Sequence, residues 1–199
     1  MMMSYLEHAR SDNCVIEVRS LGTSTFSGLF DDLDALRDAA LSVSDSHNIF
    51  TTLNRPGGAL EATNRLSQGV QCCRDADITL ITRLPFDFDP VRPKGTNSTN
   101  AELALARERA YALWGFLRSW GWPEPLIACS GNGYHLQYRC RLPATQTTAD
   151  ALAILYRGLA QRCSDETVSF DAVVRNPARI FRLYGSVNRK GPNTADRPQ

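Results

Sequence analysis

The sequence of 199 residues lacks the features that mark several large classes of protein. No stretch approaches the roughly 20 consecutive apolar residues that a membrane-spanning helix needs. The start, Met1–Ser11, mixes acidic and basic residues without an apolar core, so it does not resemble a secretory signal. There is no internal repeat and no low-complexity segment. These absences predict a soluble, globular, cytoplasmic protein with no membrane partner.

Patterns of metal-binding cysteines are also missing. The six cysteines form no C-x-x-C pair, Cys72 and Cys73 are adjacent, and only three histidines are present. Adjacent cysteines are poor ligands for one zinc ion, so we expect no zinc site. Reduced, mostly buried thiols are the simpler interpretation.

Charge of one sign is scarce overall, because the formal net charge is +1. The region after Asp171 departs from this balance, with only Asp196 as an acidic residue. Its basic residues are Arg175, Arg179, Arg182, Arg189, Lys190 and Arg197. A local positive patch suits a phosphate-bearing ligand, although such a run is more often an ordinary solvated surface.

The first part of the chain predicts an αβ unit. Helical spacing of apolar residues indicates a helix over Leu33–Val43, capped by Asp31 or Asp32. The expected strands are Val15–Leu21, Thr25–Leu29 and Asn48–Leu53. A Pro-Gly-Gly break follows, and a short helix is expected around Ala59–Leu66.

The second part predicts the order β-α-β-β-α-β. The first helix follows a capping box, Thr99 with Glu102, and Gly121 and Pro123 end it. The second helix covers about Ala149–Arg162. The expected strands are Ile78–Asp89, Leu126–Cys129, Tyr134–Leu142, Val168–Val174 and Arg179–Leu183. We therefore predict an α+β fold: an RRM-like (split βαβ) module over 71–191, an N-terminal αβ unit (1–70) packed on it, and a polar tail (192–199).

The sequence Phe86-Asp87-Phe88-Asp89-Pro90 ends the predicted strand of the module. Side chains alternate along a strand, so Asp87 and Asp89 face one way and the phenylalanines the other. Two close carboxylates repel unless a cation lies between them, and oxygen ligands suit Mg²⁺ or Mn²⁺. A solvated strand end is the alternative interpretation of this pair.

A glycine-rich hairpin follows, with the sequence Ser130-Gly131-Asn132-Gly133-Tyr134-His135. Its glycines allow a ligand to approach the backbone, and its amides with the Ser130 hydroxyl can cradle phosphate oxygens. His135 stands at the start of the next strand, beside this turn. The hairpin is therefore a candidate triphosphate contact, although a single histidine is often structural.

The last candidate residues lie near the C-terminus. Asp171 follows an apolar residue on a predicted strand, as Asp87 does. Arg179 and Arg182 belong to Asn-Pro-Ala-Arg-Ile-Phe-Arg-Leu, and Lys190 to Asn-Arg-Lys-Gly. Each of these residues alone is compatible with an ordinary structural role.

Taken in order, these motifs resemble the archaeo-eukaryotic primase superfamily. Its three motifs resemble the D-x-D strand, the S-G-x-G-x-H hairpin and the strand in which Asp171 follows an apolar residue. The stretch Asn176–Gly191 is similar to the primase domains at the front of phage and plasmid primase-helicases. The resemblance covers about Asp75 to Gly191. It implies a DNA primase or primase-polymerase, hence a nucleotidyltransferase.

The resemblance also implies roles for individual residues. Asp87, Asp89 and Asp171 would be the catalytic carboxylates that hold two Mg²⁺ or Mn²⁺ ions. The residues that would contact the nucleotide are Ser130, Gly131, His135, Arg179, Arg182 and Lys190. The implied partners are a DNA template and primer, NTPs or dNTPs, and a helicase domain or subunit. We expect a phage or plasmid origin, and the polar C-terminus fits either a fragment of a longer protein or a small natural domain.

Two other functions fit parts of the sequence. Asp87-x-Asp89-x-Val91 matches the nucleophile motif of haloacid-dehalogenase-type phosphatases, but nearly ninety residues precede it, and that family begins with it. A non-catalytic nucleic-acid-binding module or replication initiator is the other alternative. A pure binder would avoid carboxylates at the centre of its sheet, because they repel phosphates. The choice of sugar and the manner of initiation stay open.

Overall fold

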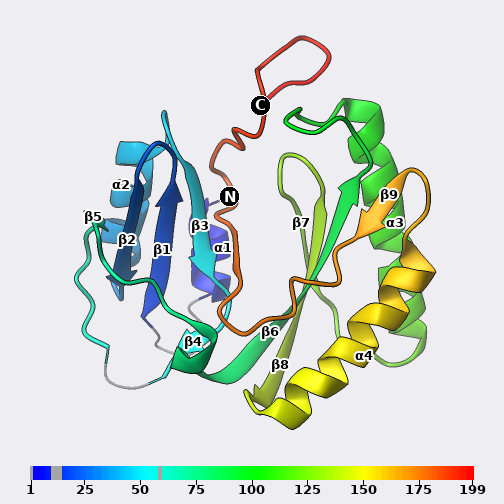
Figure 1. Ribbon diagram of the computed structural model, residues 1–199, viewed down its shortest axis with the longest axis horizontal. Helices are drawn as coiled ribbons and strands as arrows, with labels where there is room; N and C mark the ends of the chain where they lie inside the picture. Colours follow the sequence, from blue (N-terminus) through cyan, green and yellow to red (C-terminus); the bar gives the residue numbers. More distant parts are fainter. Residues whose placement is uncertain (1, 10–14, 58–59) are drawn as a thin grey trace. The chain divides into compact units, whose positions relative to one another are not determined.

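The computed structural model describes residues 2–9, 15–57 and 60–199. These residues form two compact units. The first contains the described residues up to Thr82 together with Leu142–Ala144 and Pro177–Val187. The second contains Arg83–Arg141, Thr145–Asn176 and Asn188–Gln199. Their elements are labelled in Figure 1, and none of the described helices is long and apolar enough to span a membrane.

The first unit is built on an antiparallel sheet with the strand order β10-β3-β1-β2-β5. Its strands are β1 (Ile16–Leu21), β2 (Thr25–Phe30), β3 (Asn48–Thr52), β5 (Ser67–Gln68) and β10 (Ile180–Arg182). A tight turn joins β1 to β2, so that Leu21 pairs with Thr25 and Ile16 with Phe30. The predicted strands of this region are confirmed to within a residue or two.

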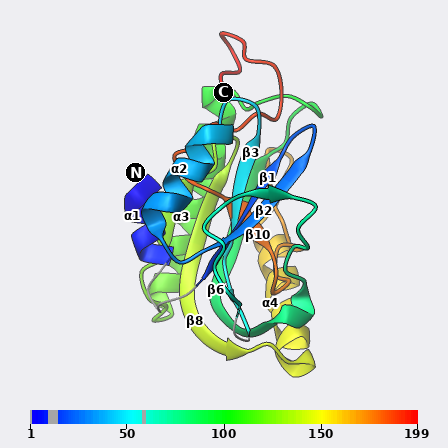
Figure 2. The same ribbon diagram turned by 90° about the vertical axis from the view of Figure 1, so that its left-hand side faces the viewer.

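Two helices, α1 (Met2–Ala9) and α2 (Leu33–Val43), lie on one face of this sheet (Figures 1 and 2). The Asp32 side chain caps α2, because it accepts hydrogen bonds from the backbone amides of Asp34 and Ala35. Between the helices and the sheet lies a core of fully buried side chains: Leu6, Val18, Phe30, Leu36, Ala40 and Ile49. The sequence did not lead us to expect α1.

The second unit has the predicted order β6-α3-β7-β8-α4-β9. Its elements are β6 (Ile78–Pro90, which starts in the first unit), α3 (Asn100–Ser119), β7 (Leu126–Cys129), β8 (Tyr134–Pro143), α4 (Gln146–Cys163) and β9 (Val168–Phe170). The sheet order is β6-β8-β7, and β9 pairs with the other edge of β6. The strand order β9-β6-β8-β7 is the split βαβ arrangement, so the α+β, RRM-like prediction is confirmed. The short strand β4 (Arg55–Pro56) and a 3₁₀ turn (Asp75–Asp77) flank the start of β6.

Aromatic side chains fill the core of the second unit. The Phe86 ring lies 5.4 Å from Tyr138, 5.4 Å from Tyr156 and 5.7 Å from Phe170, centroid to centroid. The Tyr156 hydroxyl donates to the Pro85 carbonyl oxygen at 2.7 Å, which joins α4 to β6. Such ring pairs add to the burial of apolar area, and they fix β6 against α4 and the neighbouring strands β8 and β9.

The short helix predicted around Ala59–Leu66 is wrong for residues 60–66, and Ala59 lies outside the described residues. This segment runs along β2 instead. The amides of Thr63 and Asn64 both donate to the Leu29 carbonyl at 2.9 Å, and the Asn64 side chain accepts from the amides of Asp31 and Asp32. Tertiary hydrogen bonds therefore replace the helical ones.

Two further predictions are corrected at the C-terminal end. The strand expected over Val168–Val174 ends at Phe170, because the Asp171 side chain accepts a hydrogen bond from the Val173 amide and turns the chain. The strand expected over Arg179–Leu183 exists as β10, but it pairs with β3 in the first unit.

Candidate active site

The two carboxylates of β6 lie on the face of the strand opposite the aromatic core. Phe86 and Phe88 are fully buried, whereas the side chains of Asp87 and Asp89 are 18% and 40% exposed. The alternation predicted for Phe86–Asp89 is therefore present. Because both phenylalanines are held in the aromatic core, the backbone that carries the carboxylates has little freedom to rotate.

Asp171 lies next to Asp87, directly after the strand that pairs with β6. Phe88 pairs with Phe170 in the antiparallel ladder, and the Asp171 amide donates to the Asp87 carbonyl at 3.0 Å. Residues directly opposite in antiparallel strands present their side chains on the same face. One carboxylate oxygen of Asp171 also accepts from the Val173 amide at 2.7 Å. The fold thus places Asp171 beside Asp87, although the two residues are 84 positions apart in sequence.

His135 on β8 contacts the same carboxylate from the other side. Its Nε2 lies 3.2 Å from Oδ1 of Asp87, and its side chain is only 6% exposed. A nearly buried imidazole at this distance fixes the orientation of the carboxylate. The sequence-predicted residues Asp87, Asp89 and His135 therefore meet in the second unit.

Gly133 allows the hairpin to lie against β6. A Cβ at this position would be 2.4 Å from the Phe88 carbonyl oxygen and 3.0 Å from Oδ1 of Asp89. The first distance is far below van der Waals contact, so no other residue fits without movement of the backbone. Gly131 has a φ of +88°, a conformation that favours glycine. The two glycines predicted for ligand approach thus also serve close backbone packing.

The hairpin amides have partners within the protein. The Ser130 amide donates to the Gly133 carbonyl at 2.9 Å, the Gly131 amide to the Cys129 sulfur at 3.3 Å, and the Asn132 amide to the Ser130 hydroxyl oxygen at 3.4 Å. The Ser130 hydroxyl donates to the Gly133 carbonyl at 3.3 Å. Contacts of Ser130 and Gly131 with a nucleotide stay predictions, and they would require some of these bonds to be exchanged.

Arg92 joins the hairpin to Asp89. Its Nη1 lies 3.4 Å from Oδ1 of Asp89 and donates to the carbonyl oxygens of Pro90 at 3.1 Å and Asn132 at 3.2 Å. Its side chain is 6% exposed. No sequence motif singled out this arginine. The sequence signal for the pair of Arg92 and Asp89 was their spacing of three residues, but the conformation of the loop decides whether the two side chains meet.

Asn97 is a second residue that the sequence analysis missed. It is fully buried, accepts from the Gly191 amide at 3.0 Å and donates to the carbonyl oxygens of Gly191 at 3.2 Å and Pro192 at 3.0 Å. It therefore fixes the segment that carries Lys190. The Asn188 side chain secures the same segment by donating to the Ser130 carbonyl at 2.8 Å.

The charges around Asp89 oppose one another. Burial and the neighbouring Asp87 carboxylate raise the pKa of Asp89, whereas Lys190, Arg92 and His135 act to lower it. The net direction is upward, so ionised Asp89 is unfavourable at this place. A divalent cation next to both carboxylates would remove the repulsion.

The donor set suits a hard cation that keeps several other ligands. Among the described residues, no three His, Cys, Asp or Glu side chains converge closely enough to enclose an ion. Mg²⁺ commonly binds through one or two carboxylates together with waters and substrate phosphates. Asp87 and Asp89 fit that kind of site, and the Asp171 backbone is hydrogen-bonded to that of Asp87.

The two remaining candidates, Arg179 and Arg182, belong to the first unit. Arg182 on β10 is buried, donates to Oδ1 of Asn48 at 3.1 Å and to the Val187 carbonyl at 3.2 Å, and stacks over the Phe50 ring at 4.6 Å. Burial lowers its pKa to about 10. These contacts give Arg182 a structural role within its own unit, and its predicted contact with nucleotide is not tested by them.

The fold and the carboxylate site define an α+β protein with an RRM-like module that carries acidic residues on the sheet face opposite its aromatic core. No known family profile matches the sequence, and no curated protein is significantly similar to it. Among solved structures, the chain is similar to the polymerase domain from Mycobacterium tuberculosis ligase D in complex with DNA, with a TM-score of 0.50 and 18% identity. The match covers 91% of this chain and 62% of that one, so the chain spans less than two thirds of its neighbour. At this identity the similarity concerns the fold.

Proposed function

We propose that this protein is a metal-dependent nucleotidyltransferase of the primase-polymerase type, which adds nucleotides to a strand on a DNA template. The observation that carries the proposal is the grouping of Asp87, Asp89 and His135 on one sheet face, with Asp171 directly after β9 and bonded through its amide to the Asp87 carbonyl. The structural neighbour, itself a polymerase domain bound to DNA, has the same fold and supports this class of activity.

In this proposal Asp87, Asp89 and Asp171 hold Mg²⁺ or Mn²⁺. Bound divalent ions would supply the Lewis acidity that lowers the pKa of a primer hydroxyl and neutralises the leaving pyrophosphate. The protein's own contribution is to keep the carboxylates in place. Phe86 and Phe88 fix the β6 backbone, His135 orients the Asp87 carboxylate, and Arg92 orients that of Asp89.

The incoming nucleotide would contact the basic and hairpin residues around the carboxylates. Lys190 is exposed, and its charge lowers the pKa of Asp89, so it lies within electrostatic range of the site. Ser130, Gly131 and His135 would meet the triphosphate from the hairpin. Arg179 and Arg182 belong to the first unit, and contacts of these two arginines with nucleotide or template phosphates form a separate part of the proposal; Arg182 is the weaker candidate because it is buried against Phe50.

The biological setting that we propose is replication of a phage or plasmid, with a helicase domain or subunit as partner. Either NTPs or dNTPs would serve as substrates. A binding module without catalysis is the alternative, and the paired carboxylates of Asp87 and Asp89 argue against it. Phosphates approaching Asp87 and Asp89 would be repelled unless cations were present.

The decisive experiment measures incorporation of labelled nucleotide on single-stranded DNA, with and without a primer, in Mg²⁺, Mn²⁺ or EDTA. We expect incorporation that requires a divalent ion and disappears in Asp87→Asn. Asp38→Asn, which removes an exposed carboxylate on α2, is the matched control and should keep full activity. Metal-dependent DNA binding without incorporation under any condition would favour the binding module.

A further inference from the structure

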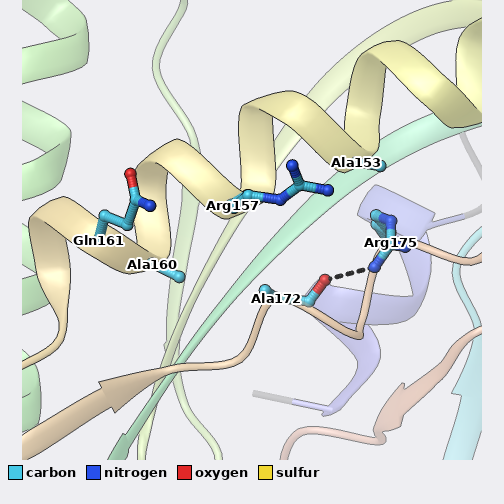
Figure 3. A pocket seen from close by; sticks show the side chains of 6 residues that line it. All are labelled: Ala153, Arg157, Ala160, Gln161, Ala172 and Arg175. Carbon is cyan, nitrogen blue, oxygen red and sulfur yellow. Dashed lines mark hydrogen bonds between the residues drawn. The ribbon is translucent and has the colours of Figure 1, made fainter.

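A second candidate binding site lies in the second unit, against α4. A pocket of about 340 Å³ is lined by Ala153, Arg157, Ala160, Gln161, Ala172 and Arg175 (Figure 3). Four of these residues lie on one face of α4, and the other two belong to the segment that follows Asp171. None of the residues assigned above to metal or nucleotide lines this pocket.

Small side chains make the hollow. The helix contributes Ala153 and Ala160, and the facing segment contributes Ala172. Residues 153, 157, 160 and 161 recur at the three- and four-residue spacing that places side chains on one helix face. The alanines therefore leave a recess between longer polar side chains, and its volume reaches the lower end of the range for small-molecule sites.

Two arginines enter this pocket from opposite sides. Figure 3 shows the Arg157 side chain extending along α4 toward Arg175. Arg175 is held in place because its Nη1 donates to the Ala172 carbonyl at 2.8 Å. Among the described residues, neither guanidinium forms an ion pair with a carboxylate.

The sequence of α4 leaves the charge of Arg157 uncompensated. Its neighbours three and four positions away are Ala153, Ile154, Ala160 and Gln161, and none is acidic. Paired glutamates or aspartates at these positions are the usual stabilising partners of an arginine on a helix. Two positive charges placed close together without such partners repel each other, and an anion between them would relieve the repulsion.

We propose that this pocket binds the phosphate group of a nucleotide or of a nucleic-acid strand. The guanidinium fork matches phosphate oxygens and can bind them through two hydrogen bonds, and Gln161 offers a further amide donor.

This site is independent of the proposed polymerase activity, because it contains no carboxylate and needs no divalent ion. It is nevertheless connected to the carboxylate site through the chain. The Val173 amide, between Ala172 and Arg175, donates to the Asp171 side chain. A ligand held by Arg175 would therefore restrict the segment that positions Asp171.

The test measures binding of two probes by the whole chain in EDTA: fluorescent ATP, and a short fluorescent oligothymidylate without a terminal phosphate. Arg157→Gln and Arg175→Gln remove the two pocket charges. Arg162→Gln is the matched control, since Arg162 lies on the same helix but stacks over Phe116 at 3.9 Å. Thermal unfolding of each variant establishes that it is folded.

We expect roughly tenfold or greater loss of affinity in each pocket variant, the size of a lost charged hydrogen bond, and little change in Arg162→Gln. Loss confined to ATP identifies a free nucleotide as the ligand, and loss confined to the oligonucleotide identifies a strand phosphate. Equal affinities in wild type and both pocket variants would overturn the proposal. An equal loss in Arg162→Gln would do so too, because it would reveal only general electrostatic attraction.

Discussion

Nε2 of His135 lies 3.2 Å from Oδ1 of Asp87, so the glycine-rich hairpin and the D-x-D strand meet at one carboxylate. The contact gives His135 a definite physical task in the protein without substrate: it orients Asp87. This task differs from the triphosphate contact that the sequence resemblance implies for His135. The two roles predict different kinetic effects.

Substitution of His135 by alanine distinguishes these roles. If His135 orients Asp87, His135→Ala raises the Mn²⁺ concentration for half-maximal activity and lowers kcat by roughly 10- to 100-fold, as for other residues that orient metal ligands. The measurement is a metal titration at saturating nucleotide. A rise in nucleotide KM alone, with an unchanged metal dependence, would assign His135 to the nucleotide instead.

Substitution of Asp89 by asparagine should separate stability from activity. The pKa of Asp89 is raised in the folded protein, so its ionised form at neutral pH costs stability when no cation is bound. Asp89→Asn should therefore raise the free energy of unfolding in EDTA, by less than about 1 kcal/mol because the group is partly exposed. It should also abolish nucleotide incorporation.

The companion measurement for Asp89→Asn is unfolding with added Mn²⁺. A bound ion stabilises the folded state by mass action, so wild type should gain stability from Mn²⁺ and the variant should gain much less. A variant that is less stable than wild type in EDTA would show that its contact with Arg92 outweighs the repulsion from Asp87.

A side chain at position 133 should disrupt the site. In Gly133→Ala the new Cβ would meet the Phe88 carbonyl and the Asp89 carboxylate, and we expect a loss of about 1–3 kcal/mol in unfolding free energy, as for overpacked cores. Gly158→Ala is the control, because Gly158 lies within α4 with no atom within 4 Å of a new Cβ. It should stabilise the protein by about 0.5–1 kcal/mol. Urea denaturation measures both, and equal stability of the two variants would contradict the packing argument.

The C-terminal segment should detach in acid. Arg197 forms two hydrogen bonds to Glu102, at 2.8 and 2.9 Å, and these lower the pKa of Glu102. A carboxyl with a lowered pKa stabilises the folded state above its ordinary pKa, and this contribution disappears as pH falls through the lowered value. We therefore expect amide hydrogen exchange in residues 191–199 to increase, relative to intrinsic rates, below about pH 4.5.

The matched variant for this prediction is Arg197→Gln, which should show the faster exchange already at neutral pH. Exchange in α4, far along the chain from this pair, serves as the internal reference. Protection of residues 191–199 that stays constant from neutral pH to pH 3 would indicate that Asn97, which also bonds this segment, holds it without help from the ion pair.

The sequence predicted the structure best where one local rule applies. The capping box of Thr99 and Glu102 starts α3 as predicted, and the alternation of Phe86–Asp89 places the carboxylates on the face opposite the aromatic core. The helix predicted for residues 60–66 is wrong, because the amides of Thr63 and Asn64 donate to the Leu29 carbonyl instead. Such edge pairing depends on a partner strand more than thirty residues away.

The amino-acid sequence by itself determined the order of elements in the second unit and the orientation of Asp87 and Asp89, because caps and strand alternation act over a few residues. Only the tertiary structure decided which partners those carboxylates have. Whether His135 reaches Asp87, whether Arg92 binds Asp89 and the hairpin together, and whether β10 joins β3 all depend on how strands distant in sequence pair. Those pairings follow from the packing of the whole core, which no local pattern encodes.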